Sequence, residues 1–379
     1  MINFYMPTRI IFGQASISRL KQMVEADLEA KKLFLVTDKG IVNAGIAEKV
    51  ASQFPDIAVY DEIEANPRHH TVNRGGELAQ EFKPDLVIGL GGGSALDSAK
   101  AISLLATNGG GIEDYEGKEK YRLPPLPVVA VPTTCGTGSE VTWVSVVTHV
   151  ERKFKMSIKG PHMFPVLALV DPDLLISLPA HLVASTGLDA LTHAVEAFIS
   201  KAATPFTDVF ALRSFQLIID NLERAYRDIK NDKEAREKIM LGSTLAGIAF
   251  GNSDVGAVHC LSEAVGSLYD TPHGIANSVF LPYVLEFNLP ESVKKYAVLA
   301  QKAGIKEKEE RKAAQMLIQK IRDLSHLLGI PSLRELGIEE NKFKEIALKS
   351  FQNNSNPSNP RQAGVDDYLG ILHRTYQGK

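Results

Sequence analysis

The sequence has only two cysteines, no long apolar run and no marked excess of one charge. Cys135 and Cys260 lie far apart among the 379 residues. They provide no disulfide framework and suit a reducing compartment such as the cytoplasm. No stretch approaches the roughly 18 apolar residues that span a bilayer. The first residues, MINFYMPTRIIFG, lack the basic start and apolar run of a signal peptide. We therefore expect a cytoplasmic protein that does not act at a membrane.

The charge balance and the length narrow the class further. Lys and Arg number 42 against 45 Asp and Glu, which gives a net charge of −3. Domains that bind nucleic acids usually carry a strongly basic face, so we expect no nucleic-acid partner. A chain of 379 residues exceeds the size at which one hydrophobic core stops growing, so two domains are expected.

The first half alternates short apolar runs with helical patterns. The apolar runs are residues 33–37, 85–90, 127–131 and 165–170, and helical candidates include residues 16–30 and 72–81. Such runs suit strands that are buried on both faces of a parallel sheet, and the alternation predicts a doubly wound α/β domain. Residues 141–157 differ, because they resemble an antiparallel hairpin that turns at residues 151–153.

After residues 171–172 clear strand patterns disappear. Apolar residues then recur at helical spacing, best at residues 184–198, 208–221, 234–250 and 257–268. We therefore predict an α/β domain over residues 1–180 and an all-α domain over residues 181–379.

Two loops in the first half carry small, hydrogen-bonding residues. Gly91-Gly92-Gly93-Ser94 follows one predicted strand, and the loop at residues 133–140 (TTCGTGSE) follows the next. Glycines let backbone N–H groups approach an anion, and a helix N-terminus attracts negative charge. One glycine loop is equally compatible with a tight turn, but open α/β sheets bind ligands at the carboxyl ends of their strands, so the pair favours a nucleotide site. Asp38, at another strand end, suits either a ribose contact or a helix N-cap.

Four residues in the second half form a candidate metal site. Asp189 and His193 are four residues apart, which places both on one helix face. His259 lies in a second helical segment, and His273 stands at a helix start that Pro272 and Gly274 indicate. One carboxylate and three imidazoles suit iron or zinc, although each residue alone also fits a structural role. A structural role is expected for the remaining histidines, which are His69, His70, His149, His162, His181, His326 and His373.

Long motifs in the same order resemble the iron-dependent, or group III, alcohol dehydrogenase family. They are GGGSALDSAK (91–100), PTTCGTGSEVT (132–142), MFPVLALVDP (163–172), STGLDALTHAVEAF (185–198) and DTPHGIAN (270–277). The resemblance implies a Rossmann-like dinucleotide-binding domain followed by a helical metal-binding domain, the two-domain architecture of dehydroquinate synthase. It also implies an active site in the cleft between the domains.

The resemblance assigns roles to individual residues. Asp189, His193, His259 and His273 would bind the catalytic metal, with Fe²⁺ expected and Zn²⁺ as the alternative. Phe250 would line the substrate pocket. Glu263 stands where many relatives carry a histidine, so its carboxylate would relay a proton or contact a polar substrate. The alternative is a structural glutamate on the helix face that pairs with a nearby cation. The positions similar to NAD contacts in the family are Asp38, Asn66, Gly92, Gly93, Ser94, Asp97, Thr133, Thr134, Thr137, Val146 and Lys155.

The expected reaction is reversible hydride transfer between a small primary alcohol or diol and NAD. We expect a small alcohol or aldehyde as the substrate and a homodimer or higher homo-oligomer as the assembly. One alternative is an NAD- and metal-dependent lyase of the dehydroquinate-synthase type, although the C-terminal motifs lack a basic cluster for a substrate phosphate. The other is a non-catalytic nucleotide-binding protein, which would have no need of a metal-ligand set.

Overall fold

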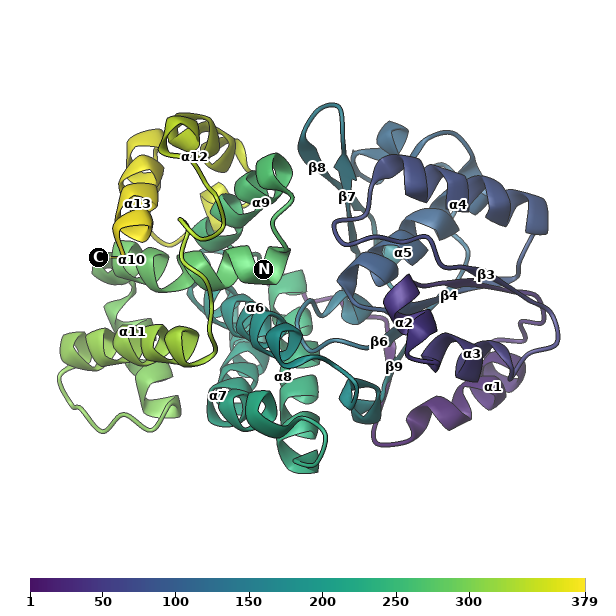
Figure 1. Ribbon diagram of the computed structural model, residues 1–379, viewed down its shortest axis with the longest axis horizontal. Coiled ribbons are helices and arrows are strands. Elements are labelled where there is room, and N and C mark those ends of the chain that lie inside the picture. Colours follow the sequence, from purple (N-terminus) through teal and green to yellow (C-terminus); the bar gives the residue numbers. More distant parts are fainter. Residues whose placement is uncertain (379) are drawn as a thin grey trace. The chain divides into compact units, whose positions relative to one another are not determined.

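The computed structural model describes residues 1–378 and contains two compact units (Figure 1). One unit is Met6–Leu178, and the other joins Met1–Tyr5 to Pro179–Lys379. Among the described residues, no helix combines the length and the apolar character that crossing a membrane requires.

A six-stranded parallel sheet forms the centre of the α/β unit. Its strand order is β1-β9-β6-β4-β2-β3, and every pair within it is parallel. The four predicted strands correspond to β2, β4, β6 and β9, whereas β1 and β3, at the two edges, were not predicted. The parallel α/β fold class is confirmed. The strands are β1 (Arg9–Phe12), β2 (Leu33–Val36), β3 (Ile57–Tyr60), β4 (Leu86–Gly91), β6 (Val128–Pro132) and β9 (Leu167–Val170).

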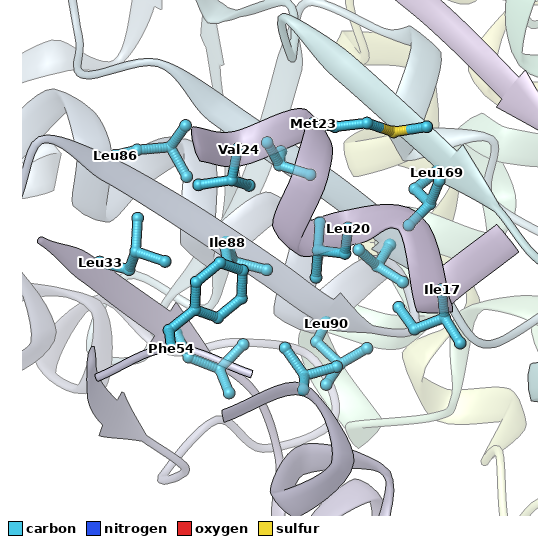
Figure 2. Close-up of a cluster of buried hydrophobic side chains, with 14 of the residues drawn as sticks. Ile17, Leu20, Met23, Val24, Leu33, Phe54, Leu86, Ile88, Leu90 and Leu169 are labelled. Atoms are coloured by element: carbon cyan, nitrogen blue, oxygen red, sulfur yellow. The ribbon is translucent and has the colours of Figure 1, made fainter. Parts of the chain in front are cut away.

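Both faces of this sheet are buried. In β2, Leu33 and Leu35 belong to one apolar cluster, and Phe34 and Val36 belong to another, because successive side chains of a strand point to opposite faces. The second cluster includes residues of α4 (His69–Phe82) and α5 (Gly93–Asn108). Figure 2 shows the first cluster, to which the N-terminal helical segment contributes.

That N-terminal segment, predicted as one helix over residues 16–30, winds in three different ways. It begins as a 3-10 helix (Ser16–Arg19), continues as α1 (Leu20–Gln22) and ends as a π turn (Met23–Asp27). Its buried side chains include Ile17, Leu20 and Met23 (Figure 2). Val24 is buried beside them, so one face of the whole segment packs on the sheet although its winding changes.

The predicted hairpin is confirmed. Strands β7 (Val144–His149) and β8 (Phe154–Lys159) pair antiparallel, and β5 (Gly117–Lys118) adds to β8 in a separate three-stranded sheet. Val147 and Met156 of the hairpin pack into the same cluster as α4 and α5, which fixes the hairpin beside the main sheet.

The second unit is helical, as predicted. Its longest helix, α10, begins at His273, directly after Pro272, and α6 contacts α7, α8 and α10. The helices are α6 (Ala180–Ile199), α7 (Pro205–Asp228), α8 (Lys233–Asn252), α9 (Ala257–Tyr269), α10 (His273–Lys302), α11 (Glu310–Leu327), α12 (Phe343–Gln352) and α13 (Val365–Gln377).

Candidate functional site

The predicted cofactor loops meet at the carboxyl ends of the central strands of the main sheet. The chain places β3 on one side of β2 and β4 on the other, so the strand order reverses between β2 and β4. Such a switch point is where open α/β sheets bind ligands. Asp38 follows β2, Gly92 follows β4, and the Thr133 N–H donates to the Gly91 carbonyl oxygen at 2.9 Å.

The glycines allow these loops to approach each other closely. Gly92 precedes the first residue of α5, and a Cβ atom at Gly92 would lie 3.1 Å from Thr134 Cγ2. A Cβ atom at Gly93 would lie 2.5 Å from Thr137 Cγ2, a distance that real Cβ contacts do not reach. A larger residue at Gly93 would therefore force Thr137 to shift, and the N-terminus of α5, with Ser94 in its first turn, adjoins the loop at residues 133–140. This cradle fits a pyrophosphate.

Asp38 caps the helix that follows it. Its Oδ1 accepts a hydrogen bond from the Ile41 N–H at 3.0 Å, at the start of α2 (Lys39–Asn43). The N-cap alternative is thus confirmed, while the ribose contact stays a prediction. The two roles are compatible, because Oδ2 lies beside Gly91, where an added Cβ atom would be 3.2 Å from it.

A buried lysine holds the cradle together. Lys100 on α5 donates to Ser139 Oγ (2.7 Å), Thr142 Oγ1 (3.2 Å) and the Val144 carbonyl (2.8 Å). Burial lowers the pKa of Lys100, and the nearby Asp97 carboxylate opposes that shift. Lys100 therefore fastens α5 to the threonine loop and to β7.

Asp97, predicted as a cofactor contact, is engaged inside the same network. Its Oδ1 accepts from Ser139 Oγ at 2.6 Å, and its Oδ2 accepts from the Val146 N–H at 2.9 Å. These bonds give Asp97 and the Val146 backbone a part in shaping the loop. Lys155 Nζ on β8 donates to Asn66 Oδ1 at 3.0 Å, so two of the residues predicted as cofactor contacts lie together.

In the helical unit, the structure gathers all four predicted metal ligands. Asp189 and His193 lie on α6, His259 on α9, and His273 at the start of α10. One ligand atom from each lies within 4.8 Å of the others, and three of the four residues are buried. Burial disfavours a charged Asp189, but the surrounding imidazoles outweigh it, so the pKa of this carboxyl group is lowered.

The amide of Asn277 shows where these ligand atoms point. Its Nδ2 lies 2.6 Å from Asp189 Oδ1, 3.1 Å from His259 Nε2 and 3.2 Å from His273 Nε2. Asn277 Oδ1 accepts a hydrogen bond from the Ser262 hydroxyl. Three acceptor atoms thus converge on one donor, and a carboxylate with three imidazoles is a donor set for a divalent first-row metal. The residues present fit such an ion.

Glu196, which the sequence analysis missed, sets the orientation of His259. Its Oε2 lies 2.5 Å from His259 Nδ1, and its Oε1 accepts from the Val258 N–H at 2.8 Å. A proton on Nδ1 leaves Nε2 as the lone-pair atom that faces the cluster, the arrangement found behind metal-bound histidines. Burial lowers the pKa of His259, but the Glu196 hydrogen bond and charge outweigh it, so this pKa is raised. The 189, 193, 196 spacing along one helix face was the available signal.

Two further predicted residues lie beside this cluster. The Phe250 ring on α8 stacks on the His193 ring at 4.3 Å between centroids, so it covers one predicted metal ligand. Glu263, one helical turn after His259 on α9, accepts a hydrogen bond from Asn353 Nδ2 at 2.6 Å. An amide, not a cation, is thus the hydrogen-bonding partner of that carboxylate.

Comparison with known proteins decides the family. The model of iron-containing alcohol dehydrogenase matches residues 7–172, and that of the Fe-containing alcohol dehydrogenase family C-terminal region matches residues 183–376. The chain belongs to the iron-containing alcohol dehydrogenase family. The family resemblance drawn from the motifs is confirmed, and the protein is an enzyme of the oxidoreductase class.

Relatives in this family match over almost the whole chain. The NAD-dependent methanol dehydrogenase of Bacillus methanolicus is 37% identical, with 98% of this chain and 99% of the relative covered. The 1,3-propanediol dehydrogenase of Klebsiella pneumoniae is also 37% identical, with 99% of each covered. A solved structure of 1,3-propanediol oxidoreductase has a TM-score of 0.94 at 37% identity, with 99% of this chain and 100% of that chain covered.

Proposed function

We propose that the protein transfers hydride reversibly between a small primary alcohol or diol and NAD at a metal held by Asp189, His193, His259 and His273. The observation that carries this proposal is that one ligand atom from each of these four residues lies within 4.8 Å of the other three. Fe²⁺ is the proposed metal, because the family is iron-containing, and Zn²⁺ is the alternative that the same ligands accept.

The chain's own groups prepare that centre for the reaction. A bound metal supplies a Lewis acid that stabilises negative charge on the substrate oxygen. Glu196 keeps His259 in the tautomer that presents Nε2, and Phe250 shields one face of His193. Glu263, one turn from His259, is proposed to take part in proton release or in the choice of substrate.

We assign cofactor binding to residues 1–180 and metal binding to residues 181–379. The cradle of Gly92, Gly93 and Ser94, with Thr133, Thr134 and Thr137 opposite, suits the pyrophosphate of NAD. Asp38 would contact the adenosine ribose through its Oδ2 and repel a 2′-phosphate. Asn66 and Lys155, which bond to each other, and Asp97 and Val146 behind the loop complete the proposed cofactor site.

Relatives support a small substrate. The names of two of them specify methanol and 1,3-propanediol, which are both small alcohols, and the first is NAD-dependent. A cytoplasmic location and assembly as a homodimer or larger homo-oligomer remain part of the proposal.

The test is turnover and metal content of variants that lack one ligand. His259→Ala and His273→Ala should each lose most of the bound metal and most NADH formation across a panel of small alcohols. His326→Ala removes an exposed histidine and should retain both. Stoichiometric metal with near-normal rates in both ligand variants would refute the assignment. A lyase of the dehydroquinate-synthase type would form no net NADH, and a non-catalytic binder would be unaffected by metal removal.

A further inference from the structure

Three histidines and a glutamate gather in the α/β unit, where the sequence analysis expected only structural histidines. His69 and His70 begin α4, and Glu151 lies in the turn between β7 and β8. His69 Nε2 is 3.3 Å from Glu151 Oε2, and His70 Nε2 is 3.6 Å from Glu151 Oε1. His149 stacks on His69 at 4.3 Å between ring centroids, and its Nδ1 is 3.1 Å from Glu151 Oε2.

The distances within this group match those between ligands of one metal ion. Ligand atoms of His69, His70 and Glu151 all lie within 4.8 Å of one another. Nitrogen and oxygen ligands about 2.0–2.2 Å from a tetrahedral zinc ion lie roughly 3.4 Å apart. The two separations across Glu151 therefore need little rearrangement to admit an ion.

The group has a buried side and a solvent side. His69 is 7% exposed and forms the buried side. His70 and Glu151 are 55% and 62% exposed, so an ion can reach them from solvent.

We propose that His69, His70 and Glu151 form a second metal site, which takes Zn²⁺ or another divalent first-row ion that favours imidazole, with water completing its coordination. His149 packs beside the ligands and supports His69 and Glu151. The ion would join the start of α4 to the β7–β8 turn, where the backbone of Arg68 already bridges to Thr148. This site is separate in sequence and unit from the Asp189 cluster and does not rest on the proposed dehydrogenase activity.

The experiment is a Zn²⁺ titration of the metal-loaded enzyme, followed by elemental analysis after removal of free ion. We expect one zinc per chain beyond the resident metal, and a rise in Tm with zinc concentration. His70→Ala and Glu151→Gln alter exposed side chains, so both should fold and should bind the additional zinc at least about tenfold more weakly.

Two control variants separate the sites. His326→Ala lacks an exposed histidine outside the group and should bind the additional zinc as the wild type does. His273→Ala should lose the resident metal and still bind that zinc. The proposal is wrong if no additional zinc binds, or if His70→Ala and Glu151→Gln bind it with wild-type affinity.

Discussion

Replacing Glu196 by glutamine tests whether the residue behind a metal ligand controls the site. The carboxylate accepts two hydrogen bonds, from the Val258 N–H and from His259 Nδ1. A glutamine of the same size has one acceptor oxygen and one donor nitrogen, so it can satisfy only one of the two. If its NH₂ group faces His259, Nδ1 must accept, and the proton moves to Nε2, the atom required for the metal.

The expected loss follows from this change of tautomer. Residues that support metal-bound histidines typically contribute 10–100-fold to metal affinity, which corresponds to about 1.4–2.7 kcal/mol. Competition with a chelator of known affinity measures the change in metal Kd. We expect Glu196→Gln to weaken metal binding within that range, with the helical unit still folded by circular dichroism.

The matched control is Asp171→Asn. Asp171 is also a buried carboxylate that accepts backbone hydrogen bonds, from Ala15 and Ile17, but it lies in the other unit. Its variant should lose stability and keep wild-type metal affinity. A metal Kd for Glu196→Gln within twofold of wild type would refute the tautomer argument.

Three further substitutions probe the cofactor and substrate residues. Gly93→Ala places a methyl group against Thr137 and should raise the KM for NAD, whereas Gly370→Ala, with open space at its Cβ position, should not. Asp38→Asn keeps an N-capping oxygen and should narrow the kcat/KM preference for NAD over NADP; a wild-type preference for NADP would contradict the ribose role. Glu263→Gln should change the pH profile of alcohol oxidation or the ranking of alcohols at unchanged metal content, with a rate loss of about 10²–10⁴-fold for a pure proton relay. If the rate, the pH profile and the ranking of alcohols are all unaltered in Glu263→Gln, the role of Glu263 is structural and consists of its hydrogen bond to Asn353.

Features that depend on local spacing could be predicted from the sequence. The buried strands β2, β4, β6 and β9 are continuous apolar runs, and the four-residue step from Asp189 to His193 places both on one helix face. Strand β3, Ile57–Tyr60, was missed because it is a short edge strand with partly exposed side chains, so its apolar pattern is weak.

Features that depend on packing between distant segments could not be predicted. Glu196 and His259 are 63 positions apart, and they lie on α6 and α9, which both pack against α10. His69 and Glu151 are further apart still, and they meet because the start of α4 lies along β7. A periodic pattern indicates which face of an element is buried, but it does not indicate which other element covers that face.

The proposed metal ligands are distributed over three helices, which has a consequence for local opening of the chain. Asp189 and His273 are 84 positions apart (273 − 189), with His259 between them on a third helix. An ion bound by these residues would cross-link the three helices reversibly. It would raise the free energy of any local unfolding that separates α9 or the start of α10 from α6. Metal loss would therefore expose the short connections at residues 253–256 and 270–272 to proteases, and the parallel sheet would remain protected. Metal supply would thus govern the lifetime of the enzyme in the cell as well as its rate.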